Sequence, residues 1–105
     1  PPPVATPTPE PVAPAATPTS TLLASVQSAV AAGDLDRGAA LSERALRISP
    51  RDANLWYQLA LIRYRQQRFS EAGDTARRAL SMAGSDAVLQ RQINTLLQQI
   101  GSGAP

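Results

Sequence analysis

Apolar residues in this chain recur with a helical period from residue 21 onward. Near the C-terminus Leu89, Ile93, Leu96, Leu97 and Ile100 are spaced i, i+4, i+7, i+8 and i+11, which places them on one face of a helix. Strict alternation of apolar and polar residues, the pattern of a half-buried strand, is absent from the sequence. The pattern therefore predicts an all-α fold in which each helix buries one face.

Capping and terminating residues divide this region into five predicted helices. Gly33 and Gly84 suit the left-handed position that follows a helix, and Pro50 stops the second helix. Asp52 and Ser70 are good N-cap residues for the third and fourth helices. The expected helices cover about residues 22–32, from Asp34 or Asp36 to 48, 53–67, 71–82 and 86–100.

The N-terminal segment, residues 1–20, has a different composition. It holds eight of the ten prolines and a single charge, Glu10. Because each proline ring fixes φ and removes an N–H donor, this segment is predicted to be an extended tether with polyproline II character. The alternative is a ligand for an aromatic groove, since Pro11 and Pro14 have the PxxP spacing. We therefore expect a tether over residues 1–20 and one folded domain over residues 21–105.

The helical region repeats with a period of about 34 residues. A unit of this length is a helix–turn–helix that cannot bury its apolar face alone, so successive units must stack. Most paired positions keep a small or apolar character. The pairs are Leu22 with Trp56, Leu35 with Phe69, Gly38 with Ala72, Ser42 with Ala76, Ala45 with Ala79 and Leu46 with Leu80.

The second unit carries a pattern that resembles the tetratricopeptide repeat. Trp56, Leu59 and Ala60 match the first helix of that repeat, and Phe69 and Ala72 begin the match to its second helix. The resemblance implies a right-handed α-solenoid fragment of two repeats, over about residues 20–52 and 53–84. A capping helix over about residues 86–100 would complete it.

Two features depart from the repeat pattern. Arg63 stands where a tyrosine is usual. Gly38 and Gly73 lie inside predicted helices, where each costs about 1 kcal/mol relative to alanine. Two repeats are also fewer than the three or so that such arrays usually need. We therefore expect marginal stability, and a monomer or a weak dimer.

The resemblance also implies where a protein or peptide partner binds. In tetratricopeptide arrays the first helices of the repeats line a concave groove that usually holds a peptide. By position, that groove would be lined by Leu23, Gln27, Val30, Asn54, Tyr57, Leu61, Tyr64 and Arg65. Tyrosine combines an apolar ring with a polar tip and is favoured at interfaces. The other interpretation is that Tyr57, Leu61 and Tyr64 are partly buried against a neighbouring helix.

Arginine supplies all ten positive charges of the chain. Beside Arg65, the second unit holds a secondary basic patch of Arg63, Arg68, Arg77 and Arg78. The net charge is only +2, and Glu71 and Asp74 lie among these arginines. An acidic protein partner or a solvated surface is therefore favoured over nucleic acid.

The sequence offers little chemistry for catalysis. It contains no Cys and no His, which removes thiolate and imidazole groups from metal coordination and from acid–base chemistry. A Gly-rich phosphate loop is also absent, and Asp34 and Asp36 are explained as capping residues. We expect no catalytic residue, no metal site and no cofactor, and hence a protein that is not an enzyme.

The layout of the chain suggests a more specific function. A Pro/Thr/Ala spacer leading into a two-repeat domain resembles the outer-membrane lipoproteins that activate a class A penicillin-binding protein, a peptidoglycan synthase, in pseudomonad-type bacteria. That resemblance implies a periplasmic interaction module held to the outer membrane through a lipid anchor on a cysteine upstream of Pro1. The alternative is a self-associating scaffold or assembly factor of a pilus or secretion complex, and the alternative location is the cytoplasm.

Overall fold

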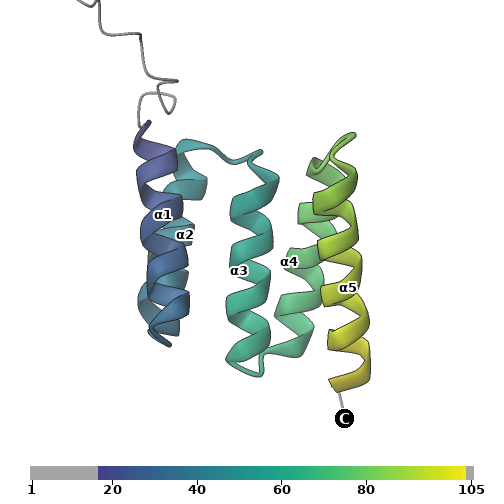
Figure 1. The fold of residues 1–105 in the computed structure, drawn as a ribbon. Coiled ribbons are helices and arrows are strands. Elements are labelled where there is room, and N and C mark those ends of the chain that lie inside the picture. The colour runs from purple at the N-terminus through teal and green to yellow at the C-terminus, as the bar shows by residue number, and fades with distance from the viewer. Residues whose placement is uncertain (1–16, 104–105) are drawn as a thin grey trace, which may run out of the picture.

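The computed structural model describes residues 17–103, which form five α-helices joined by short turns (Figure 1). The helices are α1 (Pro18–Ala31), α2 (Leu35–Ile48), α3 (Ala53–Arg65), α4 (Phe69–Met82) and α5 (Ala87–Gly103). The predicted all-α fold with five helices is confirmed. Residues 1–16, which hold most of the expected tether and its PxxP spacing, lie outside the described residues. No helix in residues 17–103 combines the length and the apolar character needed to cross a membrane.

The helices run alternately in opposite directions, and each packs on the next one in the chain (Figure 1). α3 lies at the centre, because it also touches both α1 and α5. Within residues 17–103, α2 and α4 do not touch each other. One side of the domain is therefore built from α1, α3 and α5, and the other from α2, the opposite face of α3, and α4.

α1 begins earlier than the sequence predicted. Its first residue is Pro18, whose missing N–H is not needed in the first turn of a helix. The Thr17 hydroxyl caps this turn by accepting a hydrogen bond from the Ser20 N–H at 3.0 Å. Thr19 and Ser49 are joined through their hydroxyl groups at 2.9 Å, which fixes the start of α1 to the α2–α3 turn. The last residues assigned to the tether are thus helical.

Side-chain caps mark the starts of α2 and α3 but not the start of α4. Asp34 caps α2 through the Arg37 N–H at 3.2 Å, and Asp52 caps α3 through the Asn54 N–H at 3.0 Å. The prediction that Ser70 caps α4 is wrong, because that helix begins at Phe69 without a side-chain cap. Phe69 is the residue that the repeat pairs with Leu35, the first residue of α2. The first residue of α4 therefore follows from the repeat period and not from a capping side chain.

The turns inside the two repeats share an unusual backbone conformation. Gly33, after α1, has φ of 79°, and Gln67, at the same position one period later, has φ of 64°. This left-handed region costs a residue with a side chain about 1–2 kcal/mol, whereas glycine adopts it freely. The repeat therefore extends to the backbone, even where the glycine is not kept.

The core places small residues of one helix against large residues of the next. Ala72, Ala76 and Ala79 of α4 are fully buried, and the apolar stripe of α5 packs against the same cluster. The side chains of that stripe that are at least nine-tenths buried are Leu89, Ile93, Leu96 and Ile100. α5 therefore covers the open side of the second repeat, as the spacing of its apolar residues predicts.

The two helix-interior glycines have different surroundings. A Cβ atom on Gly38 would lie 3.0 Å from Cδ1 of Ile62 and 3.5 Å from Cγ2 of Val30, both in the buried core. A Cβ atom on Gly73 would come no closer than 3.6 Å to another group, the guanidinium of Arg77. Gly38 thus permits close packing of α2 on α3, whereas Gly73 lies where a methyl group fits.

Gly73→Ala is therefore expected to raise the free energy of unfolding by about 0.5–1 kcal/mol, because alanine restricts the unfolded chain and favours the helix. Gly38→Ala should give no gain or a loss, since Ile62 must shift to admit the methyl group. Urea denaturation followed by far-UV circular dichroism measures both variants. Equal gains would contradict the close α2–α3 contact.

Candidate functional site

α3 and α5 border a cavity of about 280 Å³ on the side of the domain that α1, α3 and α5 share. Its lining residues are Tyr57 and Leu61 from α3, and Arg91, Gln92, Thr95, Leu96 and Gln99 from α5. Leu96 is buried, Tyr57 and Leu61 are half-buried, and the polar residues of α5 are exposed. An apolar centre with a polar rim is the usual composition of a protein-binding surface.

α3 presents Tyr57 here because its other faces are occupied. Leu55, Leu59 and Ile62 are buried, whereas Tyr57 packs only partly against the cluster that contains the α5 stripe. Among the described residues, the Tyr57 hydroxyl makes no hydrogen bond. The ring is thus held in place while its polar tip remains available to a partner.

Tyr64, further along α3, has a more structural role. Its ring meets Phe69 edge to face, with ring centroids 5.7 Å apart and an interplanar angle of 63°. It is half-buried and does not line the α3–α5 cavity. Tyr64 therefore supports the turn into α4, in the geometry that aromatic pairs prefer.

The remaining predicted groove residues are spread over the same side. Leu23 is half-buried against a cluster of buried residues from α2 and α3, and Gln27 is exposed one turn later. Asn54 and Arg65 are exposed at opposite ends of α3. Val30 is only 8% exposed and packs with buried residues of α1 and α3. Val30 is thus part of the core beneath this surface.

Sequence reasoning missed the contribution of α5 to this surface. Arg91 and Thr95 line the cavity, and each lies one repeat period after a predicted groove residue, Tyr57 and Leu61 respectively. Extending the period by one more step would have found them. α5 therefore lies where the first helix of a third repeat would lie. It also caps the second repeat.

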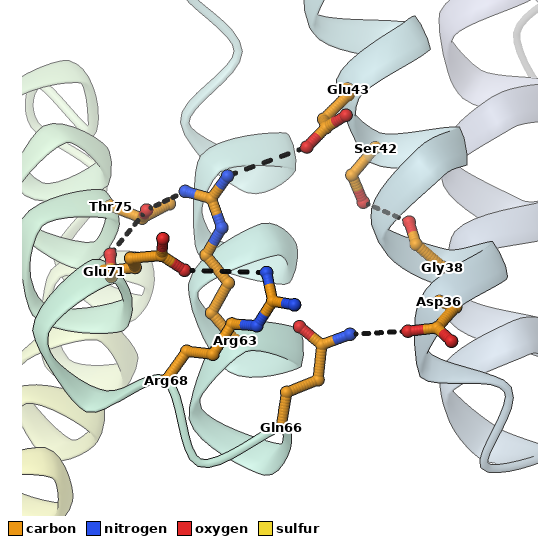
Figure 2. Close-up of polar contacts among 9 residues, drawn as sticks. All are labelled: Asp36, Gly38, Ser42, Glu43, Arg63, Gln66, Arg68, Glu71 and Thr75. Atoms are coloured by element: carbon orange, nitrogen blue, oxygen red, sulfur yellow. Dashed lines mark hydrogen bonds and ion pairs between the residues drawn. The ribbon is translucent and has the colours of Figure 1, made fainter.

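Arg63, the first residue of the predicted basic patch, connects three helices (Figure 2). Its guanidinium donates a hydrogen bond of 2.6 Å to Oγ1 of Thr75 on α4 and lies 3.6 Å from the Glu43 carboxylate on α2. Thr75 in turn donates to the Glu71 carbonyl oxygen at 2.7 Å. The arginine that replaces the usual tyrosine thus joins α2 and α4, which do not otherwise touch within residues 17–103.

The other members of the basic patch are also engaged. Arg68 lies 3.7 Å from the Glu71 carboxylate (Figure 2), and Arg77 is paired with Asp74. The Arg78 guanidinium lies 5.3 Å from the centre of the Trp56 ring, within the range of a cation–π contact. The four arginines therefore form a polar surface over α3 and α4. Three of them, Arg63, Arg68 and Arg77, are paired with carboxylates.

Two further polar residues of α2, a serine and an aspartate, have structural roles. Ser42 is fully buried and donates to the Gly38 carbonyl oxygen at 2.8 Å. Asp36 accepts a hydrogen bond of 3.0 Å from the Gln66 amide, which joins the ends of α2 and α3 (Figure 2). In the described part of the chain, no group of three acidic residues is placed to hold a metal ion.

A larger cavity, about 500 Å³, lies along α1 and the start of α2. Six of its lining residues are the small side chains of α1 and the turn after it, and the others are Asp34 and Arg37. It holds no aromatic or long apolar side chain that could anchor a partner. The α3–α5 cavity is therefore the better candidate site, despite its smaller volume.

Comparison with known proteins agrees with this architecture. A model of the tetratricopeptide repeat matches residues 29–100. The globular C-terminal domain of P. aeruginosa LpoP has a similar structure, with a TM-score of 0.78 and 36% sequence identity. The match covers 81% of this chain and 80% of that one. No curated protein matches the chain.

Proposed function

We propose that this chain, which belongs to the tetratricopeptide repeat family, is a non-enzymatic module that binds and activates a class A penicillin-binding protein. The observation that carries the proposal is the likeness to the LpoP domain, at 36% identity over four fifths of both chains. It agrees with the resemblance of the chain's layout to lipoprotein activators of these synthases. The tetratricopeptide fold itself serves protein–protein interaction.

The binding surface in this proposal is the side built from α1, α3 and α5. The half-buried Tyr57 and Leu61 would anchor an apolar side chain of the synthase, because they border a cavity that α5 leaves open. Exposed polar residues of α5, such as Arg91 and Gln92, would form the rim and fix orientation through hydrogen bonds.

The location that goes with this function is the bacterial periplasm. The Pro-rich residues before Thr17 would serve as the spacer between an outer-membrane lipid anchor, upstream of Pro1, and the repeat domain. The synthase is anchored in the opposite membrane, so a spacer is needed for the domain to reach it. Proline-rich sequences suit this role because they resist collapse.

Self-association, the alternative function, has less support. The large apolar side chains most exposed among the described residues are Ile48 and Val88, and these two lie on different helices, α2 and α5. The outward residues of α5 are chiefly Gln, Asn, Thr and Arg. A stable contact between copies would need a larger apolar patch than these residues form.

Two assays test the proposed function with the full chain. In a glycan polymerisation assay, addition of the chain should raise the polymerisation rate of the class A penicillin-binding protein from the same organism. In biolayer interferometry, the two proteins should bind saturably. A synthase that neither binds the chain nor responds to it would overturn the proposal. Light scattering that shows stable dimers or larger species would favour the scaffold function instead.

A further inference from the structure

The outward face of α2 carries a row of arginines, which we call the α2 cationic face: Arg37, Arg44, Arg47 and Arg51. All four are exposed. At about 100° per residue, the three that lie within the helix fall in an arc of about 80°, and Arg51 follows just after the helix ends. In contrast to Arg63, Arg68 and Arg77, none of the four forms an ion pair with a residue in the described range.

The two acidic residues of α2 interact with residues of α3 and of the turn that follows it. Glu43 is directed toward Arg63 at 3.6 Å, and Asp36 accepts its hydrogen bond from Gln66 in the turn after α3. Figure 2 shows both carboxylates turned toward α3. Both carboxylates are thus engaged with α3 or the turn after it, and Glu43, which stands one turn before Arg47 and lines the same cavity, is paired with Arg63. The guanidinium groups of the α2 cationic face therefore have no ion-pair partner among the described residues.

An apolar cavity of about 290 Å³ adjoins this face. Its lining residues are Glu43, Leu46, Arg47, Trp56, Leu59 and Arg63. Leu46 and Leu59 are buried and Trp56 is half-buried, so the interior is apolar. Arg47 belongs both to the cavity and to the cationic face. The cavity lies on the other side of α3 from Tyr57 and Leu61.

We propose that the α2 cationic face and this cavity together form a second docking site, for an acidic segment of a protein partner. Carboxylates of the segment would pair with Arg44 and Arg47, because a guanidinium matches a carboxylate with two parallel hydrogen bonds. One apolar side chain of the segment would enter the cavity against Trp56. This site is separate from the α3–α5 cavity and does not depend on the identity of the partner proposed above.

The residues favour an acidic protein segment over a membrane surface. Helices that lie on membranes insert several large apolar or aromatic side chains, whereas α2 exposes one, Ile48. The adjoining cavity is a recess that suits a single side chain, whereas a lipid surface offers nothing to fill it. An acidic segment uses both the arginines and the cavity.

Fluorescence anisotropy with the full chain tests this site. The probe is a short labelled peptide of glutamate and aspartate with one central leucine. Arg44→Gln with Arg47→Gln should weaken binding about tenfold or more, because both lost pairs are charge-assisted. The matched control is Arg68→Gln with Arg77→Gln, which removes the same charge from arginines already paired within the domain. That control should change the affinity less than about threefold, by long-range charge alone.

Equal weakening by both double variants would overturn the site, because net charge alone would then explain binding. A peptide with alanine in place of leucine should bind several-fold more weakly, and equal binding would overturn the role of the cavity. Tighter binding to phosphatidylglycerol vesicles or to duplex DNA than to the peptide would overturn the choice of a protein segment. Tyr57→Ala should leave peptide binding unchanged, so this site and the α3–α5 surface can fail independently.

Discussion

Ile93→Ala is expected to lower the free energy of unfolding by about 2–5 kcal/mol. Ile93 is fully buried at the centre of the α5 stripe. It belongs to one cluster with Ala72, Ala76 and Ala79 of α4. The three alanines have no long side chains with which to refill the cavity that the substitution leaves. The loss should therefore fall in the upper part of this range.

A loss of that size is large for a domain of two repeats, since small domains are stable by only about 5–15 kcal/mol in total. Urea denaturation followed by circular dichroism gives the value. Val88→Ala is the matched control on the same helix, because Val88 is 60% exposed and should change stability by less than about 0.5 kcal/mol. A loss below about 1 kcal/mol for Ile93→Ala would mean that α5 is not part of the cooperative core.

Tyr57→Ala should weaken binding to the class A penicillin-binding protein by at least about tenfold. Central aromatic residues of an interface commonly contribute about 2 kcal/mol or more when truncated, and a factor of ten in affinity needs only about 1.4 kcal/mol. Tyr57 combines an anchored ring with a hydroxyl that makes no hydrogen bond among the described residues. Biolayer interferometry with the purified synthase measures the change.

Two further variants separate contact from folding in this experiment. Ser81→Ala lies on α4, on the other side of the domain, is exposed and does not line the cavity, so it should leave the affinity unchanged. Tyr57→Phe keeps the ring and removes the hydroxyl, and its effect isolates the polar contact. A Tyr57→Ala chain that remains helical and binds as tightly as the natural one would disprove the assignment of this surface.

The sequence predicts the helices well because their signals are local. Asp34 and Asp52 cap helices through hydrogen bonds to backbone N–H groups in the first turn that follows each of them. The α5 stripe predicts its own buried face because apolar spacing and burial have the same cause. Even the turn at Gln67 could be anticipated from the period, although its residue type does not favour a left-handed backbone.

Features that depend on contacts between helices could not be predicted in this way. In the sequence Arg63 is one member of a predicted basic patch, yet its partners Glu43 and Thr75 lie on two other helices. Conversely, the arginines of α2 form no ion pair within the described residues, because Glu43, one turn before Arg47, is paired with Arg63 of α3 instead. The burial of Val30 follows from the same cause, the packing of α1 on its neighbours.

The most direct test of the central claim is an NMR titration of the ¹⁵N-labelled chain with the periplasmic region of the class A penicillin-binding protein. If the α1, α3 and α5 side binds the synthase, the amide signals that shift or broaden most will include Tyr57, Leu61 and Thr95. Signals of the exposed residues of α4, such as Asp74 and Ser81, will change little. Perturbations confined to α2 and α4, or no perturbation at saturating synthase, would contradict the account.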